Sequence, residues 1–205
     1  DITKAVDLSI HAEGTGPKRL RQPVYVDFMP PCNSACPSGE NIQAWMAFAQ
    51  AGDYFEAFQQ IVEDNPFPGI MGRVCVKPCE TGCNRNHIDT TINIHAVERY
   101  IGDEAIQQKW PIRYKAKPTG KRVLVVGAGP GGLSAAYHLA RAGHTVEVFD
   151  ANDHPGGLLW TGVPDYRLPK EILDAEIDRI VKMGVNIRMN YKVEDVLKEK
   201  EEGNF

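Results

Sequence analysis

The chain has 205 residues, a length that allows one or two domains. Hydrophobic residues make up 42% of it and charged residues 24%, which is typical of a soluble globular protein. Its formal net charge is −4, so the chain lacks the excess of basic residues that is typical of proteins that bind nucleic acids or anionic membranes. No apolar run approaches the roughly 20 residues of a spanning helix, and residues 1–14 lack a signal-peptide core. We therefore expect a cytoplasmic protein.

The first 110 residues predict an arm followed by a small helical domain. Residues 1–31 contain scattered prolines and glycines that disfavour regular helix, so we expect an extended N-terminal arm there. Residues 32–110 have apolar residues at helical spacing in three places. These predicted helices begin after Ser38, begin after Asp53 and run over 92–108. The segment 65–69, NPFPG, predicts a break in the chain.

Five cysteines lie in this helical part of the sequence. They are Cys32, Cys36, Cys75, Cys79 and Cys83. An odd, clustered set in a cytosolic sequence is more typical of metal ligands than of disulfides. Thiolates suit zinc and iron–sulfur clusters, and a proline after a ligand cysteine, as in Cys36-Pro37, is typical of ferredoxins. The residues favour an iron–sulfur cluster and leave structural zinc and free thiols as alternatives.

Residues 111–120, PIRYKAKPTG, predict a polar linker, and residues 121–205 predict an α/β domain. An apolar strand over 123–126 leads into a glycine turn and a helix. A second strand over 146–149 then ends at Asp150. This strand–turn–helix–strand unit, with G-x-G-x-x-G at the turn and an acid after the second strand, predicts a dinucleotide site.

Each part of the turn has a physical role. The turn reads Gly127-Ala128-Gly129-Pro130-Gly131-Gly132. Gly127 allows the tight bend, Gly129 lets the backbone approach a pyrophosphate, and Gly132 lets the helix pack close to the strand. The start of the helix supplies free N–H groups and a positive dipole end for phosphates. Asp150 is placed to accept hydrogen bonds from ribose hydroxyls.

The rest of the chain continues the α/β pattern. A second glycine loop lies at 155–157, a helix is predicted from Pro169 to Gly184, and a strand over 185–191. A short charged helix is expected over 195–201. Three strands are fewer than a doubly wound dinucleotide fold contains. We therefore expect the chain to hold only the N-terminal part of that domain.

Five segments together resemble the glutamate synthase small (β) subunit family and the N-terminal half of dihydropyrimidine dehydrogenase. The resemblance runs from about Pro31 to the C-terminus. The segments are PCNSACPSGENIQAW, DNPFPGIMGRVCVKPCETGCNR, INIHAVERYIGD, VLVVGAGPGGLSAAYHLARAGH and HPGGLLWTGVPDYRLPK. It implies an α-helical ferredoxin-like iron–sulfur domain followed by a Rossmann-type FAD-binding domain.

The resemblance implies that the glycine turn binds FAD rather than a nicotinamide cofactor. Gly127, Gly129 and Gly132 would lie along the FAD pyrophosphate, and Asp150 would hold the adenosine ribose. Relatives make further flavin contacts through a second glycine loop, an arginine, a position after the next strand and a residue beside a cluster ligand. The matching positions here are Gly156, Gly157, Leu158, Arg167, Val193 and Val74.

For the metal centre, the resemblance implies a [4Fe-4S] cluster bound by Cys36, Cys75 and Cys79. The fourth ligand in relatives is a non-cysteine side chain on the following helix, and the matching residue is Glu98. Judged from its residue type alone, Glu98 would be a solvated helix carboxylate.

The sequence departs from the family just upstream of Cys32. Many relatives have a C-x2-C pair there, which completes a second four-iron cluster with the equivalents of Cys32 and Cys83. Residues 24–31, VYVDFMPP, contain no cysteine. Three arrangements stay open for Cys32 and Cys83: both join a single cluster, both share ligands with a partner subunit, or both stay free.

The resemblance implies an NAD(P)H-dependent electron-transfer subunit. NAD(P)H, bound by a domain that follows in relatives, would reduce FAD, and single electrons would leave through the cluster. The expected partner is a catalytic subunit such as a glutamate synthase large subunit, and the chain alone is expected to be inactive. We expect no catalytic acid or base. Two alternatives are a docking module with zinc or no metal, and the same module serving another oxidoreductase.

Overall fold

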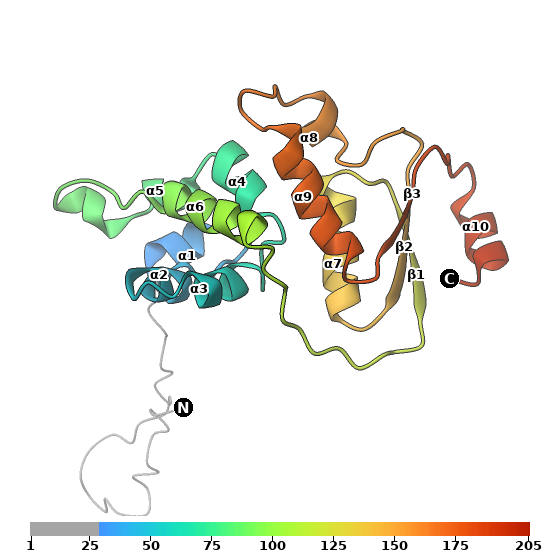
Figure 1. The fold of residues 1–205 in the computed structure, drawn as a ribbon, viewed down its shortest axis with the longest axis horizontal. Coiled ribbons are helices and arrows are strands. Elements are labelled where there is room, and N and C mark those ends of the chain that lie inside the picture. Colours follow the sequence, from blue (N-terminus) through green and yellow to red (C-terminus); the bar gives the residue numbers. More distant parts are fainter. Residues whose placement is uncertain (1–28) are drawn as a thin grey trace, which may run out of the picture.

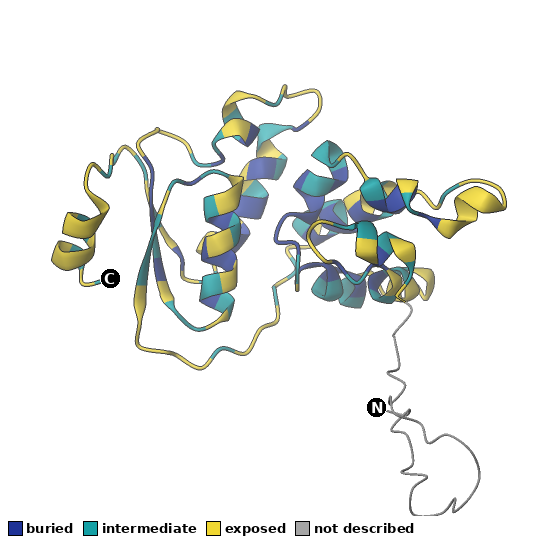
Figure 2. Ribbon diagram, turned by 180° about the vertical axis from the view of Figure 1, so that it is seen from behind, coloured by how far each residue is buried: buried dark blue, intermediate teal, exposed yellow. Residues whose placement is uncertain are grey.

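In the computed structural model, residues 29–205 are described and form a helical body followed by an α/β body (Figure 1). The helical body comes first in the chain. Its elements are α1 (Pro31–Ala35), α2 (Ile42–Gln50), α3 (Tyr54–Ile61), α4 (Pro68–Val74), α5 (Pro78–Thr81), the 3-10 helix η1 (Asn84–His87) and α6 (Ile94–Gln107). The segment around η1 projects away from the α/β body, and all four residues of η1 are exposed (Figure 2).

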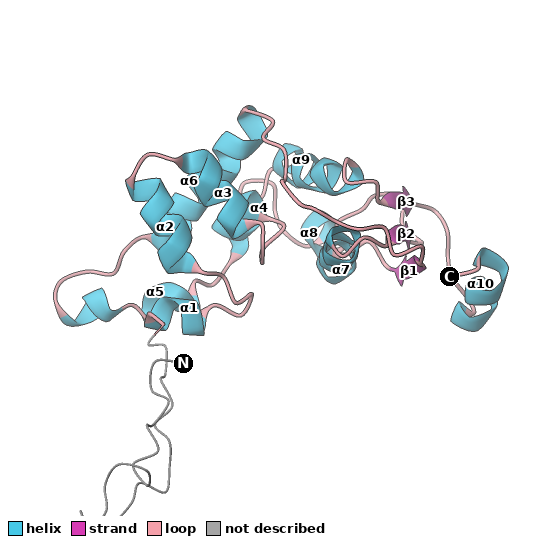
Figure 3. Ribbon diagram, turned by 90° about the horizontal axis from the view of Figure 1, so that it is seen from below, coloured by secondary structure: helices cyan, strands magenta, loops and turns pink. Residues whose placement is uncertain are grey.

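The α/β body is built on three parallel strands in the order β1-β2-β3. Its elements are β1 (Arg122–Val126), α7 (Pro130–Arg141), β2 (Thr145–Phe149), α8 (Leu158–Thr161), α9 (Lys170–Val181), β3 (Asn186–Arg188) and α10 (Val196–Gly203). Helices α7 and α9 lie on one face of the sheet and α10 lies on the other (Figure 3). The order with β2 in the middle is that of one half of a doubly wound sheet, in which further strands pair beyond β1.

Local sequence explains where these helices begin. The Asn41 side chain accepts a hydrogen bond from the Ala44 N–H at 3.2 Å and so caps α2. The same cap occurs at α10, where Asp195 accepts bonds from the N–H groups of Leu197 and Lys198. Proline occupies the first turn of α1, α4, α5 and α7, where its missing N–H costs no helical hydrogen bond.

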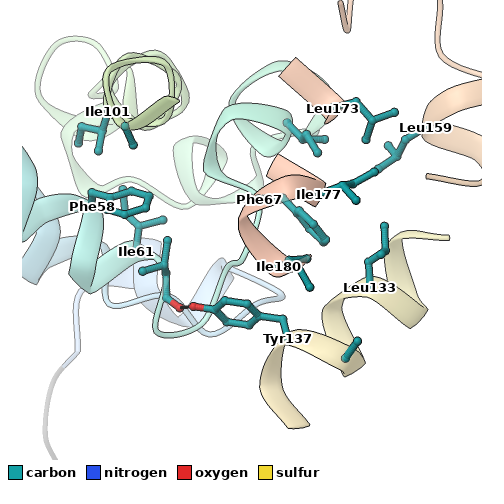
Figure 4. Close-up of a cluster of buried hydrophobic side chains, with 14 of the residues drawn as sticks. Phe58, Ile61, Phe67, Ile101, Leu133, Tyr137, Leu159, Leu173, Ile177 and Ile180 are labelled. Atoms are coloured by element: carbon teal, nitrogen blue, oxygen red, sulfur yellow. Dashed lines mark hydrogen bonds between the residues drawn. The ribbon is translucent and has the colours of Figure 1, made fainter. Parts of the chain in front are cut away.

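The two bodies share one hydrophobic core. Helix α9 packs against α4 and α6 of the helical body and against α7 of its own body. The Tyr137 hydroxyl of α7 donates a hydrogen bond to the carbonyl of Val62, the residue that ends α3. Figure 4 shows the side chains that meet at this junction. They include Phe58, Ile61, Phe67, Ile101, Leu133, Tyr137, Leu159, Leu173, Ile177 and Ile180.

The structure corrects two predicted elements. The segment 65–69 does not simply break the chain, because α4 begins at Pro68 and includes Gly69 in its first turn. Proline at a first helical position reads as a breaker in sequence but is compatible with a helix start. The third strand is also shorter than the predicted 185–191, covering only Asn186–Arg188.

The predicted N-terminal arm lies almost entirely outside the described residues. Of its range 1–31, only Met29, Pro30 and Pro31 are described, and Pro31 already belongs to α1. The linker runs along the α/β body, where Thr119 donates its N–H to the carbonyl of Gly143 at 3.0 Å.

Candidate functional site

The glycine turn lies at the carboxyl end of β1 and leads directly into α7. Gly127 has a φ of +103°, a conformation that favours glycine, and its N–H donates to the Phe149 carbonyl at 2.7 Å. Gly129 is the residue that precedes the first turn of α7. The first N–H groups of a helix have no partner within that helix. The fold therefore aims the start of α7 at the space above the turn, as the sequence predicted.

The turn is open on one side and closed on the other. A Cβ atom added at Gly127, Gly129 or Gly131 would meet no atom within 4 Å. At Gly132, by contrast, an added Cβ would lie 1.8 Å from the Gly127 carbonyl oxygen. The first three glycines thus border free space that suits a pyrophosphate, whereas Gly132 is needed for contact between helix and turn. This difference matches the roles that the fingerprint predicts.

Asp150 holds the turn in place. One of its carboxylate oxygens, Oδ2, accepts the Ala128 N–H at 2.7 Å. The other, Oδ1, accepts the backbone N–H and the side-chain Nδ2 of Asn152, each at 2.8 Å. Burial by itself would raise the pKa of Asp150, but these hydrogen bonds outweigh it and lower the pKa. A carboxylate has about four acceptor positions, so about one stays available for a ribose hydroxyl.

The second glycine loop packs directly on the turn. Gly156 donates its N–H to the Ala128 carbonyl at 2.7 Å. Gly157 lies so close that an added Cβ would be 2.9 Å from the Gly129 Cα. Leu158 follows at the start of α8 with 76% of its surface exposed. The fold thus brings together two glycine segments, at 127–132 and 156–157, that the sequence singled out separately.

The other predicted flavin contacts come from three different elements. Arg167 is exposed and donates from Nε to the Arg73 carbonyl at 3.3 Å, which joins the loop after α8 to the end of α4. Val74 is the half-buried last residue of α4. Val193 is half-buried and follows β3, two residues after Tyr191, whose N–H donates to the Asp150 carbonyl. No described hydrogen bond ties Val193 or Val74 to the glycine turn itself.

Three cysteines lie near one another. Cys36 directly follows α1, Cys75 directly follows α4, and Cys79 lies in α5. Burial, together with the nearby Cys36 and Cys75 sulfurs, raises the pKa of the Cys79 thiol to about 12. The Lys77 N–H donates to Cys75 Sγ at 3.2 Å, and the Glu40 and Ser38 N–H groups face Cys36. Such N–H donors suit thiolates that bind an iron–sulfur cluster.

Cys32 and Cys83 form a separate pair. Burial raises the pKa of Cys32, and the nearby Cys83 sulfur adds a small increase. The Ile92 N–H lowers the pKa of Cys83. Helices α1 and α5, which carry Cys32 and lead to Cys83, pack together: a Cβ added at Gly82 would lie 3.2 Å from the Ala35 Cβ. The five sulfurs therefore divide into a group of three and a group of two.

Glu98 is buried beside the group of three, so the solvated interpretation of this residue is wrong. Only 7% of its surface is exposed. Asn65 donates from Nδ2 to Glu98 Oε1 at 2.8 Å and to Glu40 Oε1 at 2.9 Å. Burial, and then the neighbouring Glu40 carboxylate, raise the pKa of Glu98 well above its usual value. Burial raises the pKa of Cys36, and the Glu98 carboxylate also raises it. The Glu98 carboxylate therefore lies near the Cys36 thiol.

Within residues 29–205, no three His, Cys, Asp or Glu side chains are grouped closely enough to hold one metal ion. A four-iron cluster places each thiolate on a different iron. We therefore compare the arrangement of Cys36, Cys75 and Cys79 with that of cluster ligands rather than with that of the ligands of a single metal ion.

Several supporting residues escaped the sequence-based prediction. Asn152 follows Asp150 by two residues, a spacing typical of local turns closed by an aspartate side chain, and this signal was present in the sequence. Asn65 and Glu40 gave no such signal in the sequence, because they lie 25 residues apart and meet only after α2 and α3 have packed.

Among residues 29–205, no helix is both long and apolar enough to cross a membrane.

Comparison with known families matches both bodies. Residues 28–110 match the family described as dihydropyrimidine dehydrogenase domain II, 4Fe-4S cluster. Residues 125–189 match the family described as NAD(P)-binding Rossmann-like domain. The expected fold class, a helical iron–sulfur domain followed by a Rossmann-type domain, is therefore confirmed.

Curated relatives match most of the chain. The chain is 37% identical over 179 residues to the glutamate synthase [NADPH] small chain of Mycobacterium tuberculosis, covering 86% of this chain and 37% of that one. It is 36% identical over 169 residues to the NAD-dependent dihydropyrimidine dehydrogenase subunit PreT of Escherichia coli, covering 82% and 41%. It is 35% identical over 185 residues to the NADP(+)-dependent formate dehydrogenase subunit beta of Moorella thermoacetica, covering 80% and 26%.

The chain spans between about a quarter and two fifths of the length of these three relatives. Two of the three names describe NAD(P)-dependent subunits of larger enzymes and the third describes a small chain, so multi-subunit oxidoreductases recur among the relatives. Over most of its length the chain is therefore similar to glutamate synthase small chains, and its two bodies are similar to a dihydropyrimidine dehydrogenase domain II, 4Fe-4S cluster, and to an NAD(P)-binding Rossmann-like domain.

Proposed function

We propose that the chain is the flavin- and cluster-binding part of an NAD(P)H-dependent electron-transfer subunit. The observation that carries this proposal is the direct connection between its two candidate sites. Helix α4 leads directly into Cys75, one of the three grouped thiols, and Arg167 of the α/β body donates a hydrogen bond to the carbonyl of Arg73 near that end. The body with the dinucleotide turn is thus bonded to the helix that carries a cluster ligand.

The donors of the cysteine group fit a [4Fe-4S] cluster. Cys36, Cys75 and Cys79 supply three thiolates, and the buried Glu98 supplies the carboxylate of a fourth ligand. Binding deprotonates the thiols, so the burial that raises the pKa values of Cys36 and Cys79 is offset by the cluster's own positive irons. Cys32 and Cys83 stand apart from this set, and we propose no second complete cluster from the chain's own residues.

The glycine turn fits the pyrophosphate of FAD. The family described for residues 125–189 is named for NAD(P), so the flavin assignment is the finer part of the proposal. It is supported by the Gly156–Gly157 loop packed on the turn and by the exposed Leu158 beside it. A bound flavin accepts two electrons as hydride and releases them singly, which is what a cluster requires. The chain's own residues hold and orient it, and none has to move a proton.

The direct test is to purify the chain anaerobically and identify what it carries. We expect released FAD, about four irons and about four acid-labile sulfides per chain. Flavin and iron–sulfur clusters absorb visible light, whereas zinc thiolates do not. A sample with stoichiometric zinc and no iron would contradict the cluster, and would favour a docking module instead. A sample that released NAD(P) in place of FAD would contradict the flavin assignment.

Asp150→Ala is expected to weaken FAD retention about tenfold or more, because it removes a ribose acceptor and the bonds that join the turn to Asn152. Retention is measured by flavin fluorescence after dialysis. Asp153→Ala is the matched control, since Asp153 is an exposed acid on the same loop that bonds only the neighbouring His154. Equal flavin content in both variants would argue against Asp150 as a contact.

Among possible partners, the names of the relatives favour a catalytic subunit of an oxidoreductase. Glutamate synthase, dihydropyrimidine dehydrogenase and formate dehydrogenase all occur among them. We propose a glutamate synthase large subunit as the first partner to test, because small chains of that enzyme match over 86% of this chain. Co-purification with a large subunit, and loss of that association on removing the helical body, would be the expected result.

A further inference from the structure

Helix α4 is held tightly between α6 and α9. On the α6 side the backbones approach closely: a Cβ added at Gly102 would lie 2.4 Å from the Gly69 nitrogen, and one at Gly72 would lie 2.5 Å from the Arg99 Cα. Arg73 of α4 also forms a bidentate pair with Asp103 of α6, at 2.7 and 2.9 Å. Within the helical body α4 is therefore fixed by backbone contact and by a charge pair.

On the other side, a single buried carboxylate joins α4 to the α/β body. Glu176 of α9 is fully buried, with 0% of its surface exposed. Its Oε1 accepts the Gly69 N–H at 3.0 Å, and its Oε2 accepts a bond from Arg179 Nη1 at 2.9 Å. A Cβ added at Gly69 would lie 2.8 Å from that Oε1, so a larger residue there would push the carboxylate away from its present position.

The far end of α4 has its own bond to the α/β body. Arg167 donates from Nε to the Arg73 carbonyl at 3.3 Å, and Arg73 is followed by Val74 and then by Cys75. The first turn of α4 is thus bonded by Glu176 and its last turn by Arg167. Both Glu176, which accepts one bond, and Arg167, which donates the other, belong to the body that carries the glycine turn.

Such a carboxylate is an unusual way to hold two hydrophobic surfaces together. Burying a charge costs free energy unless it is paired and hydrogen-bonded, and an apolar side chain of similar volume often stabilises a core as well or better. Where a buried polar contact is present, its geometric requirement restricts the surfaces to one arrangement. The main effect of the Glu176 contact is therefore to fix the position of α4 against the α/β body, rather than to stabilise the fold.

We propose that Glu176, assisted by Arg167, clamps α4 to the α/β body and so sets the gap between the dinucleotide turn and the cluster ligand Cys75. The inference rests on the proposed function. Electron transfer between two centres slows steeply as the gap between them widens, so a loosened clamp slows transfer while both centres stay bound. Glu176 is a positioning residue, since it contacts neither group.

The test compares Glu176→Leu and Glu176→Gln with the matched control Glu171→Gln. Glu171 lies on the same helix and is exposed. Leucine fills the volume but cannot accept the Gly69 N–H, whereas glutamine keeps an acceptor. A laser flash on an added deazaflavin, with EDTA as the sacrificial electron donor, reduces the flavin without nicotinamide, so the chain can be tested directly. Transfer from flavin to cluster is followed by absorption, and amide exchange over residues 68–74 is followed by mass spectrometry.

We expect Glu176→Leu to keep its flavin and iron, to slow the flavin-to-cluster step at least tenfold and to speed exchange over 68–74. Glu176→Gln should lie between it and the wild type, and it carries the test if the leucine variant fails to fold. A transfer rate within twofold of wild type in the variants, despite faster exchange, would overturn the clamp. Wild-type protein that carries no flavin or iron would instead contradict the proposed function. In that case the clamp is still tested, because unchanged amide exchange over residues 68–74 in the variants would overturn it.

Discussion

Gly129→Ala is expected to leave the fold intact and to remove most of the bound FAD. The added methyl meets no protein atom within 4 Å, so it enters the space proposed for the pyrophosphate without disturbing the turn. Gly129 has a φ of −76°, which alanine adopts without strain. Forcing a methyl into a filled site costs ~1–3 kcal/mol, which weakens retention on the order of ten- to a hundredfold.

Gly132→Ala is the informative partner of that variant, because here the methyl meets the chain itself. Its Cβ would lie 1.8 Å from the Gly127 carbonyl oxygen, so the backbone of the turn has to move. We expect flavin loss together with a fall in Tm, since each 1 kcal/mol lowers the Tm of a chain of this size by about 2–4 °C.

Flavin content after dialysis and the Tm of the cofactor-free protein separate the two effects. Gly129→Ala should lose its flavin, but the Tm of the cofactor-free variant should stay within about 2 °C of the wild type, which is less than the fall in Tm that overpacking produces. Gly132→Ala should lose both. If Gly129→Ala retained its flavin in full, the pyrophosphate would not lie against the open side of the turn. If Gly132→Ala kept its Tm, the close contact between α7 and the turn would be relaxed in solution.

The dinucleotide unit was predictable because its signals are local. The apolar run of β1, the glycines of the turn and the acid after β2 fall within 30 residues, and each has its own physical reason. The second glycine loop was also visible in sequence. What the sequence alone did not give was its contact with the turn, in which Gly156 bonds Ala128. That contact depends on how the segment after β2 folds back.

The elements that escaped prediction are short or depend on distant partners. Helices α1 and α5 contain five and four residues, too few to show a helical period. Helix α4 was hidden by Pro68 and its glycines, which read as breakers. Its glycines are explained by α6 and α9, and the Glu176–Gly69 bond joins residues 107 positions apart. Local sequence carries no record of such a pair.

The division of the cysteines was only partly accessible from sequence. Spacing alone leaves Cys32 and Cys83 indistinguishable from the other three. In the structure, Cys79 lies near Cys36 and Cys75, while Cys32 lies near Cys83. Glu98 shows the same limit, because its burial and its bond to Asn65 arise from the packing of α2, α3 and α6. The resemblance to a family, and not the residue pattern, pointed to Glu98 beforehand.

Cys75→Ser is expected to remove nearly all of the iron, from about four atoms per chain, while leaving FAD in place. Serine keeps the size of the side chain but replaces a soft thiolate by a hard oxygen that suits the cluster poorly. The change does not touch the bonds of α4 to Asp103, Glu176 or Arg167, so the flavin side is expected to persist. Iron and flavin are measured on the same anaerobic sample.

Cys83→Ser is the matched control, because Cys83 belongs to the separate pair with Cys32. If the cluster uses the group of three with Glu98, Cys83→Ser keeps its iron and Cys75→Ser does not. Loss of iron in both variants would mean that the iron centre also depends on Cys83, and would contradict the division proposed here. Loss of iron and flavin together in Cys75→Ser alone would mean that the cluster itself, and not the α4 contacts, holds the two bodies in the arrangement that binds FAD.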